Sequence, residues 1–282
     1  MRIRVQHEIR FRFEVPVKSL VRLLRLTPRN HEGQYVSSWR IDVETDCRLP
    51  VSEDAFGNIM HVLNGDGLAE GFSLQVSGEV ETFDTGGVLR GTLERFPPEL
   101  YLRDTPLTAA DLALRSFADA AVSGTESPLG QLHALMETMD SGFERLPGTA
   151  TPQANASQTL EGKRGTAVDL AHVFIAATRH LGIPARFVGG YVPEASREFG
   201  DAEVDVRVMP PPHAWAEAHV PMLGWVGFDP SKGICPQDAH VRVAIGLDRL
   251  DAAPVRAARQ GVGHEFVETR LKVTGAKDRA RP

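Results

Sequence analysis

Two side chains suited to acid–base chemistry mark the ends of an expected β-hairpin in the second half of the chain. His213 begins a strand-like stretch at 213–220, and Asp229 ends another at 225–229. The residues between them, Pro-Met-Leu-Gly at 221–224, predict a tight connection. Antiparallel pairing would bring His213 and Asp229 to the same end of the sheet. An imidazole oriented by a carboxylate is the base–orienter pair of nucleophilic catalysis.

Such a pair requires a nucleophile, and the first turn of a helix favours a reactive thiolate. Apolar residues at helical spacing predict a helix over 166–181, with Thr166 as its N-cap and Gly182 and Pro184 after its end. Helix start, histidine and aspartate follow one another in the order of a papain-like cysteine enzyme. The helix start, however, carries Ala167. The sequence therefore supplies two members of a catalytic triad and a methyl group at the position of the third.

The elements around these residues divide the chain into two parts. Strict alternation of apolar and polar residues over 3–15 predicts a long strand with one buried face, and shorter runs of the same period follow over 35–43 and 72–80. We therefore expect residues 1–100 to form an antiparallel β-sandwich. Residues 101–275 are expected to form a papain-like α/β core, which makes the chain an α+β protein. Residues 276–282 are expected to be a polar tail.

Within the expected core, the pattern also predicts two earlier helices and a loop. The helices cover 108–121, where Thr108 and Asp111 are spaced as a cap, and 128–139. The polar segment 147–163 is expected to be a long loop, and a further strand is expected over 186–192.

Composition excludes several functional classes. The 282 residues, 42% hydrophobic and 24% charged, are typical of a folded protein of about two domains. A net charge of −6 gives no chain-wide basic field for nucleic acid, and no apolar run reaches the ~18 residues of a membrane span. The N-terminus lacks the apolar core of a signal peptide, and two cysteines are too few for a disulfide framework. These features predict a cytoplasmic protein with no nucleic-acid or membrane partner.

Separately spaced segments resemble the core of bacterial transglutaminase-like proteins. They are Gly-Thr-Ala-Val-Asp-Leu-Ala-His at 165–172, Leu-Gly-Ile-Pro-Ala-Arg at 181–186, Gly-Tyr at 190–191, His-Ala-Trp-Ala-Glu at 213–217 and Gly-Trp-Val-Gly-Phe-Asp-Pro at 224–230. The first half resembles the N-terminal β-domain of the family at His7, at 24–29 and at 54–58, and segments 240–244 and 254–256 resemble its C-terminal part. The resemblance covers nearly the whole chain.

In this family the helix opens with Gly-x-Cys-x-Asp, and its cysteine forms a triad with the later histidine and aspartate. The resemblance therefore implies a Cys–His–Asp triad at positions 167, 213 and 229 that forms a thioester, with no cofactor. The implied substrate is a peptide or protein that carries an amide or isopeptide bond. A cysteine peptidase or amidase is favoured over a protein-glutamine acyltransferase. Some relatives share operons with ATP-grasp peptide ligases, so a ligase-made peptide tail is an implied substrate.

Ala167 departs from the family pattern, and two interpretations remain open. One is a deliberate Cys→Ala substitution that inactivates an enzyme, and the other is a natural pseudoenzyme that serves as a peptide-binding module. The neighbours of Ala167 still fit the active pattern, and one base change cannot convert a cysteine codon into an alanine codon. Both points favour the deliberate substitution. Cys47 in the β-domain and Cys235 in a loop are not expected to replace the nucleophile.

Four further residues are candidates for substrate binding, namely His172, Trp215, Tyr191 and Arg164. Three of them also have an ordinary structural interpretation: His172 as a support for the helix, Trp215 as strand core and Arg164 as a solvated charge. Asp169 is expected to be a helix cap rather than a catalytic group. The sequence has no HExxH or CxxC motif, so no metal is expected.

Overall fold

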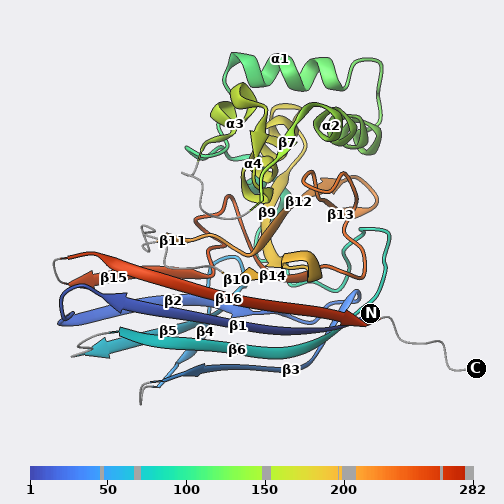
Figure 1. Cartoon of the computed structure of the whole chain (residues 1–282). Coiled ribbons are helices and arrows are strands. Elements are labelled where there is room, and N and C mark those ends of the chain that lie inside the picture. The colour runs from blue at the N-terminus through green and yellow to red at the C-terminus, as the bar shows by residue number, and fades with distance from the viewer. Residues whose placement is uncertain are drawn as a thin grey trace, which may run out of the picture.

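The computed structural model of the chain describes residues 1–44, 48–66, 71–147, 154–195, 197–198, 208–260 and 263–276. Figure 1 shows a stack of long strands and, above it, a group of helices around a smaller sheet. The α+β fold class predicted from the sequence is confirmed. Cys47 and all of the expected tail except residue 276 lie outside the described residues. No helix in the described ranges is long and apolar enough to cross a membrane.

The stack of strands consists of two antiparallel sheets of five strands each. The first has the order β10-β16-β1-β6-β3 and is formed by β1 (Arg2–Phe13), β3 (Gln34–Val43), β6 (Gly71–Thr82), β10 (Arg197–Glu198) and β16 (Glu265–Ala276). The second has the order β11-β15-β2-β5-β4 and is formed by β2 (Ser19–Thr27), β4 (Val51–Glu53), β5 (Ile59–Asp66), β11 (Val208–Met209) and β15 (Val255–Gln260).

Strand β1 shows the alternation that its sequence predicts, and its buried face serves two cores. Ile3 and Val5, near its start, pack with the helices and the smaller sheet. Ile9, Phe11 and Phe13, near its end, pack inside the sandwich. Burying a side chain of this size contributes about 1.5–3 kcal/mol. One continuous strand therefore joins the sandwich to the core above it.

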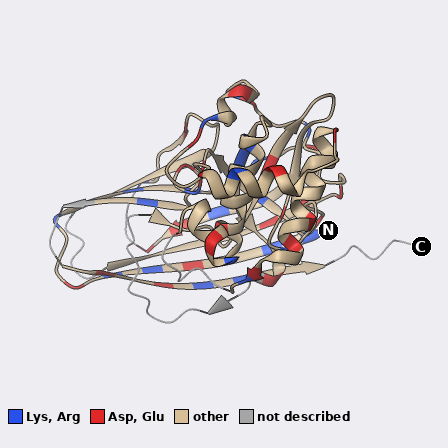
Figure 2. Ribbon diagram, turned by 90° about the horizontal axis from the view of Figure 1, so that it is seen from above, with Lys and Arg blue, Asp and Glu red and all other residues tan. Residues whose placement is uncertain are grey.

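The outward face of β1 is basic and is matched by acidic residues on β6. Arg4 pairs with Glu79, and Arg2 pairs with both Glu79 and Glu81. Figure 2 shows residues of both signs interspersed along strands and helices. Exposed pairs of this kind contribute little to stability, so the sandwich is held mainly by its buried face.

The sandwich includes C-terminal strands that we had assigned to the core. Strand β16 pairs with β1 over the whole length of β1, from Arg2 opposite Ala276 to Phe13 opposite Glu265. Strand β15 pairs with β2 in the second sheet. The chain therefore returns to the sandwich after the core. The predicted boundaries at residues 100 and 275 place β15 and β16 in the core. Their hydrogen bonds place them in the sandwich instead.

The core contains a second, smaller layer of strands covered by helices. Its sheet has the order β13-β12-β9-β14 and is formed by β9 (Ala185–Tyr191), β12 (His213–Val220), β13 (Gly224–Phe228) and β14 (Val241–Gly246). The helices are α1 (Leu112–Ala121), α2 (Pro128–Gly142), α3 (Ala156–Gly162) and α4 (Ala167–His180). The shorter elements are η1 (Pro98–Leu102), η2 (Pro193–Ala195), and β7 (Glu144–Arg145) paired in parallel with β8 (Arg164–Gly165).

Helix α4 is the central element of the core, as its two apolar sides predict. Every residue from Val168 to Arg179 is buried. Thr166 and Asp169 form a capping box at its start, which confirms the expected role of Asp169 as a cap. Gly182, just after its end, has a φ of 77°, a left-handed conformation that glycine adopts without strain.

Two local predictions in the core were wrong. Helix α1 begins at Leu112 and is capped by Asp111, because Thr108 is buried and its hydroxyl instead accepts a hydrogen bond from Arg179. The expected loop over 147–163 contains helix α3, which Asn155 and Gln158 cap through a complete capping box. A polar composition concealed this helix, although the pattern Asn-x-x-Gln signalled its start.

Candidate active site

The β12–β13 hairpin brings His213 and Asp229 together. Strands β12 and β13 pair from Ala216 opposite Phe228 to Val220 opposite Gly224, and Asp229 directly follows β13. His213 Nε2 lies 2.6 Å from Asp229 Oδ2, and both side chains are buried. The sheet thus forms the contact that the hairpin predicts.

Asp229 is held by hydrogen bonds on both of its carboxylate oxygens. Oδ1 accepts from the backbone N–H and the hydroxyl of Ser231, at 3.0 and 2.6 Å, and Oδ2 accepts from His213 and from His240. Burial alone would raise the pKa of Asp229, but the hydrogen bonds from the two imidazoles outweigh it and hold this pKa well below its usual range. Asp229 is therefore an ionised carboxylate, held in one position, that accepts hydrogen bonds and donates none.

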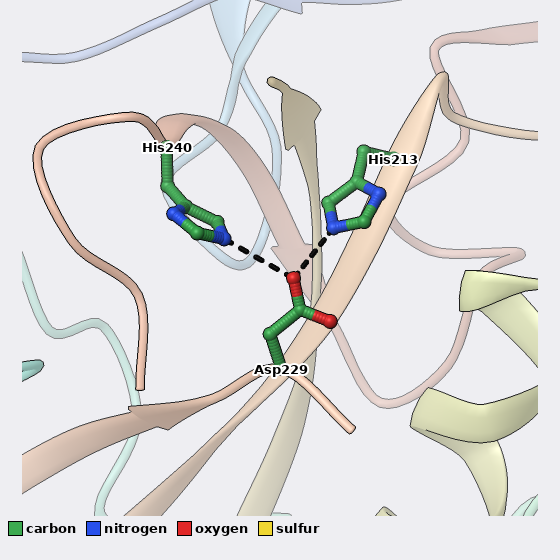
Figure 3. A group of neighbouring side chains, drawn as sticks. All are labelled: His213, Asp229 and His240. Carbon is green, nitrogen blue, oxygen red and sulfur yellow. Dashed lines mark hydrogen bonds and ion pairs between the residues drawn. The ribbon is translucent and has the colours of Figure 1, made fainter. Parts of the chain in front are cut away.

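His240 is a member of the cluster that sequence reasoning missed. Its Nε2 lies 3.1 Å from Asp229 Oδ2, and its Nδ1 accepts a hydrogen bond from the Gln237 N–H at 3.2 Å. Figure 3 shows both imidazoles directed at Asp229. Its T-shaped contact with the buried Trp215 fixes the plane of the ring. His240 lies in segment 240–244, which resembles the family, but neither its spacing nor the predicted strand pairing indicates a contact with Asp229.

The hydrogen bonds determine which ring nitrogens carry protons. An ionised carboxylate only accepts, so both Nε2 atoms that face Asp229 must carry a proton. The Nδ1 of His240 accepts from Gln237, which makes His240 a neutral Nε2–H imidazole. The Nδ1 of His213 points away from Asp229 in Figure 3. In the neutral ring Nδ1 carries no proton and has a free lone pair. Nδ1 is therefore the nitrogen of His213 that can act as a base.

A cavity of about 300 Å³ connects His213 with the start of helix α4. Its wall combines apolar and charged residues: Arg145, Leu146, Pro147, Thr166, Ala167, Val168, Val192, Glu194, Pro211, Pro212, His213, Ser231 and Lys232. Position 167 and His213 thus face the same space. The N–H groups of Ala167 and Val168 belong to the first turn of α4, where an α-helix provides no acceptor of its own. The cavity therefore offers a base, a helix N-terminus and the side chain of residue 167.

None of the four predicted substrate-binding residues lines this cavity. His172 is fully buried and its Nε2 accepts from the Arg249 N–H at 3.2 Å. Tyr191 is buried and its hydroxyl lies 3.1 Å from His7 Nδ1, so it joins core to sandwich. Trp215 packs beneath His213 and His240. Arg164 is exposed on β8. Motif position does not indicate which way a side chain points, and substrate binding by these four residues stays a prediction.

The charged residues that do line the cavity are paired. Lys232 Nζ lies 2.8 Å from Glu194, and Arg145 pairs with Asp140. The sequence did not single out Arg145 or Glu194, because no motif or spacing points to them. The half-buried Cys235 is not among the lining residues, and burial raises the pKa of its thiol. Cys235 therefore has the character of an unreactive thiol.

His213, Asp229 and His240 could be considered as metal ligands, because their ligand atoms lie within 4.8 Å of one another. A metal on His240 Nε2 requires that nitrogen to be unprotonated, which moves the proton of the neutral ring to Nδ1. At Nδ1 it would meet the Gln237 N–H, itself a donor. The donor set therefore fits a hydrogen-bonded cluster better than a metal centre.

The family of the chain follows from comparisons with known proteins. Residues 115–230, which carry helix α4, His213 and Asp229, match the transglutaminase-like superfamily, and residues 3–81 match the bacterial transglutaminase-like N-terminal region. Residues 115–230 are thus a transglutaminase-like core, and residues 3–81 are a bacterial transglutaminase-like N-terminal region. The capped helix with residue 167 at its start and the hairpin with His213 and Asp229 are thus elements of the transglutaminase-like core.

Individual proteins are similar to this chain over most of their length. An uncharacterized protein of Mycobacterium leprae is 25% identical over 97% of this chain and 98% of its own. One of Mycobacterium tuberculosis is 24% identical over 90% of this chain and 86% of its own. A crystal structure titled "Putative Cysteine Protease from Cytophaga hutchinsonii" superposes with a TM-score of 0.75 at 19% identity, covering 100% of this chain and 93% of that one. This similarity shows a shared fold.

His172 predicts a dependence of stability on pH. Its burial, and then the positive charges of Arg249 and Arg179, lower its pKa from 6.5 to about 3. Because the unfolded chain binds a proton that the folded chain rejects, this neutral ring contributes stability above pH 6.5 that is lost as the pH falls toward 3. We expect His172→Gln to remove a slope of up to about 1.4 kcal/mol per pH unit in this window. Urea unfolding at several pH values measures it.

The control for this slope is His264→Gln, at an exposed histidine. We expect the slope of this variant to equal that of the parent. If His172→Gln keeps the full acid sensitivity of the parent, then His172 is not the group that resists protonation in the folded chain.

Proposed function

We propose that the cavity is the acyl-binding site of a transglutaminase-like thiol hydrolase whose nucleophile position is occupied by Ala167. The observation that carries the proposal is the shared cavity of residue 167 and a carboxylate-oriented His213. With cysteine at 167, the site is that of a cysteine peptidase or amidase. With Ala167, the chain binds the substrate without turning it over. The proposed partner is a peptide or protein with an amide or isopeptide bond.

The geometry supports a defined role for each group in the cysteine form. The α4 N-terminus and protonated His213 stabilise the thiolate, which attacks the carbonyl carbon of the amide. The first-turn N–H groups stabilise the oxyanion that forms. The C–N bond then breaks, the proton on His213 Nδ1 goes to the leaving amine, and a thioester remains. His213 next activates the water that hydrolyses the thioester. Asp229 keeps the proton on Nε2 throughout.

Three points belong to the proposal and rest on sequence and resemblance. Water is favoured over an amine as the second acceptor, which makes the activity hydrolysis rather than protein-glutamine acyl transfer. A peptide tail made by an ATP-grasp ligase is the proposed substrate class. The sparse cysteine content supports a reducing compartment, so we propose a cytoplasmic location.

The test is the mass of the protein after incubation with substrate. Ala167→Cys is mixed with a panel of N-blocked peptides that contain glutamine, asparagine or an isopeptide bond. We expect at least one peptide to add the mass of its acyl group to the protein, because the thioester is covalent. Hydroxylamine should release this group as a hydroxamate, whereas water should release the free acid.

The matched controls separate a catalytic adduct from adventitious labelling. The Ala167 chain and Ala167→Cys with His213→Ala should gain no mass. Asp229→Asn in the cysteine form should retain the thiol but accumulate the adduct at least tenfold more slowly, on the order expected for loss of an orienting carboxylate. The alternative function, a peptide-binding module, predicts saturable binding of a peptide by the Ala167 chain and no adduct with any peptide in the cysteine form.

A further inference from the structure

Asp229 lies between two imidazoles, and the proposed reaction uses only one of them. His213 comes from the start of β12, whereas His240 directly precedes β14 and lies outside the two matched regions, 3–81 and 115–230. Figure 3 shows both imidazoles directed at the same carboxylate oxygen. The Nε2 atoms of His213 and His240 lie 2.6 and 3.1 Å from this oxygen, Asp229 Oδ2. His240 is itself held in place from its other nitrogen by the backbone of Gln237.

We infer that His240 is a positioning residue that takes up part of the hydrogen-bonding capacity of Asp229 Oδ2 and so limits how strongly Asp229 stabilises protonated His213. This inference rests on the proposed function, because His213 is the base of that reaction. The Ser231 N–H and hydroxyl already anchor Oδ1, so the loss of His240 leaves Asp229 in place. The loss of His240 instead strengthens the attraction between Oδ2 and protonated His213, because Oδ2 then accepts one hydrogen bond fewer.

The sharing of Asp229 Oδ2 between two N–H donors affects a reaction in which His213 takes part in two proton transfers. His213 must hold a proton while the thiolate attacks and must then give it to the leaving amine. An imidazole that a fully available carboxylate binds too tightly is a poor acid in the second transfer, because general acid–base catalysis works best near the operating pH. A second donor on Oδ2 weakens the attraction without removing the orientation.

The other charged groups around His213 are neutralised by partners of their own. Lys232 is paired with Glu194 on the cavity wall, and Arg145 is paired with Asp140. The hydrogen bond from Lys232 lowers the pKa of Glu194, which keeps this carboxylate ionised and paired. Among the described residues around His213, Asp229 and its second donor His240 are therefore the groups expected to set the basicity of His213.

The experiment is an NMR titration of ring nitrogens in the Ala167 chain, which needs no thiol. We compare His240→Leu, which removes the donor, with His240→Gln, whose amide N–H can replace Nε2–H. In His240→Leu we expect the midpoint of His213 protonation to rise by about 0.5–1 pH unit, because a hydrogen bond to a charged group is worth about a pH unit. In His240→Gln we expect less than half of that rise. In the parent, both rings should be Nε2–H tautomers when neutral.

Three results would overturn the inference. The first is a midpoint in His240→Leu that is unchanged or lower, and the second is an equal shift in both variants. The third needs no variant: the parent spectrum shows neutral His240 protonated on Nδ1. That spectrum decides the matter even if His240→Leu does not fold. Failure here leaves the proposed function intact, whereas an unreactive cysteine at 167 would overturn that function and leave the titration result standing.

Discussion

Ala167→Cys is expected to create a thiol that reacts with iodoacetamide at least about tenfold faster near neutral pH than either natural cysteine. Residue 167 is the first residue of α4 and lines the cavity with His213. The helix N-terminus and a neighbouring imidazolium both favour the thiolate. Cys235 has neither advantage, and burial raises the pKa of its thiol. Alkylation followed by peptide mass spectrometry measures the rate at each cysteine.

The controls use variants of single histidines. The unmodified Ala167 chain gives the rates of Cys47 and Cys235 directly. In the Ala167→Cys background, His213→Ala should slow the reaction of the new thiol severalfold, because the ion pair is lost. His180→Ala should leave it unchanged, since His180 pairs with Asp119 instead. A new thiol that reacts no faster than an ordinary exposed cysteine would mean that the cavity is a binding surface only.

Glu217→Ala is expected to lower the free energy of unfolding by about 3–5 kcal/mol, because it removes the buried carboxylate that Arg186 and Arg242 share. Glu217 is completely buried on β12 and accepts hydrogen bonds from Arg186 Nε and Arg242 Nε, each at 2.7 Å. Arg186 also binds Glu94 with both terminal nitrogens and stacks over Trp225 at 3.8 Å. This network ties β9, β12 and β14 to the segment around residue 94, and β12 carries His213 at its start.

Two further variants make the stability prediction specific. Glu217→Gln keeps the shape but not the charge and should lose less than Glu217→Ala. Asp42→Ala breaks the exposed pair of Asp42 with Arg40 and should cost less than about 0.5 kcal/mol. Urea unfolding measures all three. A loss in Glu217→Ala as small as that in Asp42→Ala would show that the buried network does not hold the sheet together.

Acid should weaken the same network. Burial alone would raise the pKa of Glu217, but Arg242 and Arg186 outweigh burial and hold it at about 2. Because this pKa is lower than that of an ordinary glutamate, the contribution of Glu217 is complete above about pH 4.5 and declines as the pH falls toward 2. The loss of stability caused by Glu217 therefore overlaps only the most acidic part of the pH range over which His172 lowers stability.

The sequence predicted the parts of the site that depend on local periodicity. Alternating residues and a four-residue turn placed His213 and Asp229 at one end of a hairpin, and the spacing of Thr166 and Asp169 located the start of α4. Strict alternation likewise predicted β1. In each case the decisive contacts are made between residues close in sequence, so a pattern in the chain is sufficient.

The sequence did not predict what depends on packing between distant segments. Strands β15 and β16 pair with β2 and β1 across more than two hundred residues, and no local pattern selects that partner. Arginine is usually a surface residue. Arg186 is nevertheless buried, because Glu217 and Glu94 from other segments accept its hydrogen bonds. The direction of the Tyr191 and Trp215 side chains likewise depends on the sheet that they occupy, and that of His172 depends on the packing of α4. The contact between His240 and Asp229 depends on the path of the segment 230–239 that joins them.

The pairing of position 167 with His213 is tested by the ultraviolet absorbance of the thiolate in Ala167→Cys as a function of pH, measured as a difference from the Ala167 chain. This difference removes the contribution of Cys47 and Cys235 and isolates the new thiol. We expect the thiolate to be present well below neutral pH, and we expect the addition of His213→Ala to move its formation upward by about one pH unit or more, because the imidazolium partner is gone. A thiolate that forms near the ordinary pKa of cysteine, about 8.5, with or without His213, would show that position 167 and His213 do not form a thiol-activating pair.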